Sequence, residues 1–266
     1  MEGGVHTPLL AAVNAITLHM SVLRTITGVW PRQYNKFPFQ RRYLVACREV
    51  LQFKKKIISF IFLFSACLVL ACDLEGHFDF DVYNNEEEIL YTGCYDAINL
   101  GPHIIEYILT KERAEATGTR RPSVRFTQNR DGGVLQNLLL KNGYSLPSHN
   151  DYTYSGYDRG HMAPNADFND TYENAVMTFF IANIWPQTPG VNRSAWLITE
   201  NETRRLASEY LFVRVVIIVD EFTENKVRDI QIPLVFKRRV YDAYTGELIY
   251  AIDVYQDEEG SRGLGE

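Results

Sequence analysis

The segment YDRGHMAP, residues 157–164, is the most informative stretch of this 266-residue chain. A histidine takes up and releases a proton near neutral pH, so His161 is a candidate acid–base group. Arg159 carries a planar guanidinium that binds phosphate through two hydrogen bonds. Gly160 between them has no side chain, which allows the backbone to approach a ligand closely. For this segment alone, a turn that holds a buried, hydrogen-bonded histidine is the plain structural alternative.

Polar residues that suit one phosphate site follow downstream. Glu200 and Arg204 are four residues apart and therefore share a helix face. Asn192 stands at the start of the same expected helix, where anions and their metal partners collect. Taken singly, Asn192 could be only a helix cap, and Glu200 with Arg204 only a surface ion pair. The wider set of spaced residues is Asn183, Trp185-Pro186-Gln187, Asn192, Glu200 and Arg204.

Together these residues resemble a known family. The chain is similar to the DNA/RNA non-specific endonucleases of the ββα-metal, or His-Me finger, class over roughly residues 100–255. This resemblance implies an α+β fold and a metal-dependent endonuclease that hydrolyses phosphodiester bonds of DNA and RNA with little sequence specificity. The matching pattern is Asp158-Arg159-Gly160-His161, Asn183-x-x-Pro186-Gln187 and Asn192-x-x-Ala195-Trp196-x-x-x-Glu200.

The resemblance also implies a role for each matching residue around the metal. His161 would be the general base that activates water. Asn192 would be the single direct protein ligand of Mg²⁺, and Glu200 would hold metal-bound waters. Asn183 would orient the histidine. Mg²⁺ is therefore the expected cofactor, with Mn²⁺ as a substitute.

Three arginines complete the expected site. Arg159 and Arg204 resemble the groups that bind the phosphate and its transition state. Arg125 resembles a further substrate-binding arginine upstream, although the loop between it and His161 differs in length from the family pattern. Contacts limited to phosphate carry no sequence information, which agrees with DNA and RNA both being substrates.

The chemistry is coherent from the residue types themselves. A positioned base accelerates phosphodiester hydrolysis by about 10²–10⁴-fold. Arginines and a metal neutralise charge that develops on the phosphate and on the leaving oxygen. Because Mg²⁺ keeps most of its waters, one asparagine with a glutamate behind the waters is a sufficient protein site.

Charge is distributed unevenly along the chain. Residues 1–72 hold 9 basic and 2 acidic side chains, out of 27 and 33 in the whole chain, so residues 73–266 carry a net charge of −13. Proteins that hold nucleic acid over a broad surface are usually basic. A nuclease with this composition must concentrate its positive charge locally.

Hydrophobic and polar patterning predicts an antiparallel β-sheet with packed helices. β-Branched and aromatic runs predict strands, Thr171 and Asn192 predict helix starts, and a Ser, Asn, Gly and Tyr-rich stretch predicts a loop. A turn at Tyr244-Thr245-Gly246 predicts a closing hairpin. The expected strands are 103–112, 212–220, 230–242 and 248–255, the expected second helix is 193–208, and the expected loop is 144–157.

The sequence divides into five segments. Residues 1–53 are an extra, Arg-rich N-terminal segment, explained by a start site assigned too early or by an organellar transit peptide. Residues 54–72 have the layout of a secretory or lipoprotein signal, with three lysines before an apolar run. We interpret residues 73–99 as an acidic tether, 100–256 as the nuclease domain and 257–266 as a tail that is short for the family.

The four cysteines lack metal-ligand spacing, so a zinc–thiolate site is not expected. Val69-Leu70-Ala71-Cys72 resembles a lipobox, which implies a membrane partner through a lipid on Cys72. Lipidation would leave Cys94 unpaired, and no disulfide is expected. The predicted location is export, to the cell envelope or the medium, with the mitochondrion as the alternative.

Two other functions fit parts of the sequence. One is a catalytically inactive envelope lipoprotein that keeps the fold as a binding module. The other is a different metal hydrolase in which Asp158 and His161 bind the metal directly. The second would need further carboxylate or histidine ligands, and none are arranged as clearly.

Overall fold

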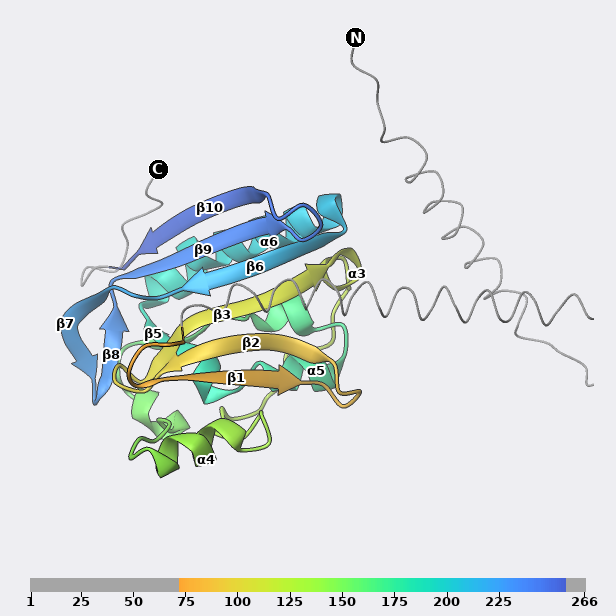
Figure 1. Cartoon of the computed structure of the whole chain (residues 1–266). Coiled ribbons are helices and arrows are strands. Elements are labelled where there is room, and N and C mark those ends of the chain that lie inside the picture. The colour runs from red at the N-terminus through yellow and green to blue at the C-terminus, as the bar shows by residue number, and fades with distance from the viewer. Residues whose placement is uncertain (1–71, 257–266) are drawn as a thin grey trace, which may run out of the picture. The chain divides into compact units, whose positions relative to one another are not determined.

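The computed structural model describes residues 72–256, and Figure 1 shows them in colour. The centre is a six-stranded antiparallel sheet with the strand order β1-β2-β3-β6-β9-β10. Helices α5 and α6 lie behind the sheet in the view of Figure 1. The predicted class, an antiparallel sheet with packed helices, is confirmed. The sheet strands are β1 (His77–Tyr83), β2 (Ile89–Asp96), β3 (Gly101–Thr110), β6 (Phe212–Ile218), β9 (Val235–Asp242) and β10 (Leu248–Tyr255).

The remaining elements are short and surround the sheet. They are α3 (Lys111–Ala114), α4 (Val134–Lys141), η1 (His149–Tyr152), β4 (Asp158–His161), η2 (Asn165–Phe168), α5 (Tyr172–Met177), η3 (Ile181–Asn183), β5 (Ile184–Gln187), η4 (Val191–Ala195), α6 (Trp196–Tyr210), β7 (Phe222–Val227) and β8 (Ile230–Pro233). Side chains from the sheet and helices interlock in one core. Phe80 meets Phe180 at 5.5 Å between ring centroids, and Trp196 meets Phe236 at 5.6 Å.

The acidic segment 73–99 is not a tether, and that interpretation was wrong. It forms β1 and β2, which pair in antiparallel register at one side of the sheet. Phe80 and Val82 of β1 are buried, whereas Asp79 and Asp81, which alternate with them along the strand, are exposed. Side chains alternate between the two faces of a strand, so the carboxylates occupy the outer face while the apolar residues enter the core. The folded domain therefore starts before residue 100.

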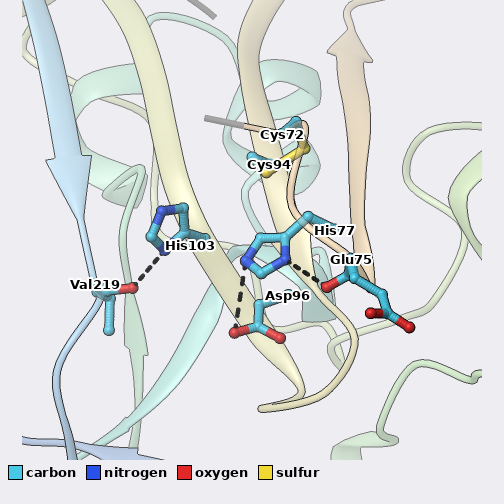
Figure 2. Close-up of a disulfide and its surroundings, with 7 residues drawn as sticks. All are labelled: Cys72, Glu75, His77, Cys94, Asp96, His103 and Val219. Atoms are coloured by element: carbon cyan, nitrogen blue, oxygen red, sulfur yellow. Dashed lines mark hydrogen bonds and ion pairs between the residues drawn. A yellow bond between two sulfur atoms is a disulfide. The ribbon is translucent and has the colours of Figure 1, made fainter. Parts of the chain in front are cut away.

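A disulfide joins Cys72 to Cys94 of β2, with 5.5 Å between their Cα atoms. The expectation that Cys94 stays unpaired was therefore wrong. Figure 2 shows the disulfide above His77, which lies 3.7 Å from Asp96 and packs against His103. The bond ties the chain just before β1 to the second strand of the sheet.

Several predicted elements are confirmed, with shifted ends. Thr171 caps α5 by accepting a hydrogen bond from the Asn174 backbone, and β9 and β10 form the expected hairpin. The strand expected over 230–242 is two strands, because the chain leaves the β7–β8 ribbon after Pro233, which has no N–H for a ladder. The loop 144–157 contains the short helix η1.

The helix expected over 193–208 begins earlier and has two parts. A π-helical turn, η4, spans Val191–Ala195 and continues directly into α6. Asn192 consequently lies within the first helical turn and not before it. Within residues 72–256 there is no helix of the length and apolarity that a membrane crossing requires. Segments 1–53 and 257–266, and the signal-like residues before Cys72, lie outside the described residues.

Candidate active site

The two-stranded ribbon β4–β5 and the following helix form a finger that carries most of the predicted site. β4 pairs with β5 in antiparallel register, with Gly160 opposite Trp185 and His161 opposite Ile184. Because side chains alternate along a strand, Arg159 and His161 leave one face of β4 and Asp158 leaves the other. The DRGH motif therefore presents side chains on both faces of the ribbon.

Gly160 leaves room for a neighbouring side chain. A Cβ at this position would overlap the side-chain amide of Gln187, which is fully buried. The close approach that the glycine permits is thus made by a side chain of β5. That Gly160 also lets the backbone approach a ligand stays a prediction.

His161 is almost enclosed. Only 8% of the residue is exposed, and its Nε2 is buried with no hydrogen-bond partner among residues 72–256. The rings of Phe126 and Phe179 lie 5.2 and 5.3 Å from its own. Burial, followed by the positive charge of Arg121, lowers the pKa of His161 to about 3. The imidazole is therefore neutral at physiological pH and can accept a proton only when new charge reaches it.

The backbone around His161 is held by two buried side chains. Trp196 of α6 donates its indole N–H to the His161 carbonyl at 3.1 Å. The Asn183 amide accepts from the Ala163 N–H at 2.8 Å and donates to the Ala163 carbonyl at 2.9 Å. Asn183 was expected to orient the histidine, and the contacts it makes are with the backbone two residues beyond the ring.

Asn192 lies beside the other face of β4. Its Nδ2 donates to Asp158 Oδ2 at 2.9 Å. Arg193 donates to both oxygens of the same carboxylate, at 2.8 and 2.7 Å, and these bonds lower the pKa of Asp158. With Nδ2 facing Asp158, the amide oxygen of Asn192 is directed away from that carboxylate. The Asp158 carboxylate is occupied by these donors, which disfavours the reading in which Asp158 binds a metal directly.

Glu200 and Arg204 both lie on α6, but no hydrogen bond joins them. Arg204 instead binds Asp167 at 2.6 Å, and Asp167 is fully buried and also accepts from the Tyr107 hydroxyl at 2.7 Å. Burial raises the pKa of Glu200 to about 7, against the opposing charge of Arg238. Glu200 makes no ion pair within residues 72–256, so its carboxylate has capacity for an additional cation.

The other predicted arginines lie on the His161 side of the ribbon. Arg159 donates to the His149 carbonyl at 2.9 Å and to the Thr153 hydroxyl at 3.0 Å. Its buried Nε has no partner among the described residues. Arg125 is exposed and donates to Asn150 Oδ1 at 2.6 Å. Burial lowers the pKa of His149, and the positive charges of Arg159 and Arg125 lower it further.

Sequence reasoning missed one arginine near the base. Arg121 lies over the Phe179 ring at 5.7 Å and acts electrostatically on both His161 and Glu200. Arg121 stands 40 residues before His161 and gave no periodic signal. Sequence reasoning also missed Asp167. This carboxylate binds Arg204 from a separate short helix, so no regular spacing in the sequence links the two residues.

The donor set fits a hard divalent cation. Asn192 offers an amide oxygen and Glu200 a carboxylate without an ion-pair partner, and both come from the continuous helix η4–α6. Magnesium prefers oxygen ligands and retains several waters. A buried imidazole and arginines complete a set suited to hydrolysing a phosphate ester.

Comparisons with known proteins show which family this chain resembles. A model of the family described as "DNA/RNA non-specific endonuclease" matches residues 77–255. A nuclease of Nostoc sp. is 48% identical over 58 residues, which is 22% of this chain and 21% of that protein. The mitochondrial nuclease of Saccharomyces cerevisiae is 31% identical over 137 residues, which is 51% of this chain and 38% of that protein.

The fold comparison points the same way. A crystal structure of an EndoG/EndoGI complex superposes with a TM-score of 0.50 at 23% identity, covering 65% of this chain and 73% of that chain. The chain spans less than two-fifths of the length of the two curated relatives above. The family match, in contrast, covers more than half of the chain and includes both the sheet and the finger. We conclude that this chain belongs to the DNA/RNA non-specific endonuclease family.

Proposed function

We propose that the protein is a metal-dependent endonuclease that hydrolyses phosphodiester bonds of DNA and RNA with little sequence specificity. His161 is the general base in this proposal. The observation that supports it most is the state of that ring, which is neutral, enclosed by Phe126 and Phe179, and has a buried nitrogen without a partner. A structural histidine in a core would use both ring nitrogens.

Mg²⁺, or Mn²⁺ in its place, is the proposed cofactor. Asn192 Oδ1 would bind it directly, and Glu200 would hold its waters. When bound, the ion stabilises negative charge on the phosphate and on the leaving oxygen. The bond from Asn192 Nδ2 to Asp158 keeps the amide oxygen available. Burial raises the pKa of Glu200, and the nearby charge of Arg238 opposes that rise.

The arginines bind and orient the phosphate. Arg204 is held by the buried Asp167, so its guanidinium has a fixed position. Arg159 and Arg125 are candidate contacts on the His161 side, and Arg121 adds charge close to the base. These groups contact phosphate and not bases, which accounts for weak sequence preference in a domain that is acidic as a whole.

An inactive binding protein that retains the fold is the second candidate. The observation that favours it is the net charge of −13 over residues 73–266, which disfavours long-range attraction of a polyanion. Against it stands the complete set of catalytic residue types within one finger.

Location is also part of the proposal. We infer export into an oxidising compartment, because the Cys72–Cys94 disulfide requires one. The disulfide consumes the thiol that a lipid would need, so we no longer propose a lipid anchor at Cys72. The alternative is the mitochondrion, which agrees with the name of the yeast relative and with the Arg-rich residues 1–53.

A cleavage assay tests the function. The full-length protein is incubated with supercoiled plasmid or with RNA, in Mg²⁺, Mn²⁺ or EDTA. The same assay is run on His161→Ala and on the control variant His103→Ala. His103 lies near the start of β3 and contacts the Val219 carbonyl (Figure 2). We expect metal-dependent cutting that falls at least about 10²-fold in His161→Ala only. No cutting by folded wild-type protein would favour the binding module.

A further inference from the structure

A cavity lined mostly by residues with polar side chains adjoins the finger on the His161 side. It has a volume of about 480 Å³ and lies between α4, η1 and the segment 125–129. This size falls within the roughly 300–1,000 Å³ of small-ligand sites in proteins. No residue assigned to the metal or to the general base lines it. The lining residues are Arg125, Phe126, Thr127, Gln128, Asn129, Gly133, Gln136, Asn137, Ser148, His149 and Asn150.

The charge of this lining differs from that of the domain. Residues 73–266 contain 31 acidic side chains, yet none of the eleven lining residues is acidic and one is an arginine. The nearby carboxylates are already occupied. Asp131 accepts from the backbone of Gly133 and Leu135, and Asp151 accepts from Ser148. The cavity is therefore a place where this acidic protein can accept an anion.

The cavity also offers unused hydrogen-bonding groups. Two of its glutamines hold the surrounding loop, because Gln128 and Gln136 bond to the backbone of residues 146–147. The side chains of Asn129 and Asn137 have no hydrogen-bond partner within residues 72–256. Each presents an amide with one acceptor and two donors, the complement of a nucleobase edge.

His149 adds a donor of defined orientation. Its Nδ1 accepts from the Phe126 N–H at 3.4 Å, and burial together with Arg159 and Arg125 lowers the pKa of the ring. The neutral imidazole that results carries its hydrogen on Nε2, which is free to donate. The His149 ring also stacks on Phe126, at 6.0 Å and an interplanar angle of 23°.

Aromatic rings connect the cavity with the proposed base. Phe126 lies between His149 and His161, and its ring centroid is 5.2 Å from that of His161. A group bound against His149 is thus separated from the His161 imidazole by the rings of His149 and Phe126. A strand with one phosphate at His161 can therefore present its neighbouring nucleotide to the cavity.

We propose that the cavity binds an unpaired base and the adjoining phosphate of a single-stranded nucleic acid, one step from the phosphate cleaved at His161. The inference rests on the proposed function. Arg125 contacts the phosphate, the amides of Asn129 and Asn137 contact the base edge, and the His149 ring stacks with its face. Stacking on aromatic side chains tolerates every base, so the site adds affinity without strict sequence preference.

Whether the nucleic acid is single-stranded or duplex decides how easily its bases enter the cavity. A base in a duplex is paired and stacked, so it enters a side pocket only after it is unpaired at a cost of a few kcal/mol. Single-stranded DNA and RNA loops present free bases. The cavity therefore favours single strands over duplexes of the same sequence.

The test compares two variants of the full-length protein. Asn129→Ala/Asn137→Ala removes the free amides of the cavity, and Asn85→Ala removes an exposed asparagine from the β1–β2 turn, outside the lining. Cutting is measured with Mg²⁺ on a single-stranded oligonucleotide and on its duplex. Binding of the same labelled single strand is measured by fluorescence anisotropy in EDTA, where no turnover is needed.

We expect the double variant to raise KM and Kd for the single strand about tenfold, through the loss of two hydrogen bonds, and to leave duplex cutting and Asn85→Ala within about twofold of wild type. Unchanged single-strand binding would overturn the proposal, as would an equal loss on both substrates. If no variant cuts any substrate, the proposed function fails, and the anisotropy measurement still decides whether the cavity holds a single strand.

Discussion

Asn192 Nδ2 and Asp158 Oδ2 are 2.9 Å apart, and this bond fixes which end of the Asn192 amide faces the finger. A carboxylate only accepts hydrogen bonds, so the NH₂ group must face Asp158 and the oxygen must face away. Asp158 thereby positions the atom that is proposed to bind the metal, without touching that metal itself.

Asp158→Asn removes this constraint. An amide at position 158 can donate to Asn192 Oδ1, which lets the Asn192 amide turn over. We expect the Mg²⁺ concentration for half-maximal cutting to rise about 10–100-fold, with activity recovering at high Mg²⁺. Arg193→Gln is the control, since it loses only an ion pair whose arginine is 69% exposed. A magnesium titration that is the same for Asp158→Asn and wild type would contradict the role.

Asp167 anchors Arg204 from a fully buried position. Asp167→Ala leaves the partly buried guanidinium and the Tyr107 hydroxyl without their acceptor. We expect the free energy of unfolding to fall by ~3–5 kcal/mol. Glu202→Ala, which breaks the exposed pair with Arg205 on the same helix, should cost ~0–1 kcal/mol. Urea denaturation measures both, and equal effects would refute the distinction.

His161 makes stability depend on pH. Its pKa is about 3 in the folded protein, below the ordinary value of 6.5, so between these values the unfolded chain binds a proton that the folded chain does not. Stability contributed by the neutral ring is complete above pH 6.5 and declines as pH falls toward 3, by up to ~1.4 kcal/mol per pH unit. His161→Phe cannot titrate. The free energy of unfolding of wild type minus that of this variant should therefore fall steadily as the pH is lowered from 6.5 to 4.5. A difference that stays constant over this range would contradict the shift.

Gly160→Ala tests the packing of the ribbon. The added Cβ would overlap the Gln187 amide, and we expect loss of ~1–3 kcal/mol in stability together with a displaced His161 and reduced cutting. Gln187→Ala in the same protein removes the obstacle and should restore much of both. Thermal unfolding and plasmid cutting of the two single variants and the double variant decide. Failure of the second substitution to rescue the first would mean that Gly160 serves another purpose.

The Cys72–Cys94 bond joins two residues that are 22 positions apart in the sequence and so closes a loop. Restricting the unfolded chain by a loop of this length is worth ~3 kcal/mol in the chain-entropy model. We expect Cys72→Ser/Cys94→Ser to unfold at correspondingly lower urea, and a reducing agent to have the same effect on wild type only. Mass spectrometry of unreduced peptides checks the pairing, and free thiols at both positions would exclude it.

The sequence predicts the class of fold better than it predicts the edges of the sheet. His161, Asn192 and Glu200 are carried by one ribbon and one continuous helix, and their intervals match the family pattern. That they act together at one site stays a prediction. The class of fold follows from the β-branched runs over β6, β9 and β10. In β1 the count of carboxylates masked the alternation of Phe80 and Val82, which carries the real signal.

Contacts between distant segments could not be read in this way. Arg121 reaches His161 through Phe179, and Asp167 reaches Arg204 from a different helix. Cys72 meets Cys94 only because β1 folds back on β2. Each of these depends on where the chain returns in space, which local composition does not encode.

The acidic outer face of β1 also bears on how copies of this protein meet. In the sheet of the described residues β1 is an outermost strand, and an unpaired strand edge can act as a template for another chain. Two molecules that approach edge to edge bring Asp79 and Asp81 of one against the same pair of the other, and their repulsion opposes intermolecular β-pairing. Burial raises the pKa of both carboxyl groups, so this protection fades at a higher pH than ordinary aspartates would allow. Acidification thus removes a barrier to self-association at β1, the strand whose acidic residues led the sequence analysis to predict a tether.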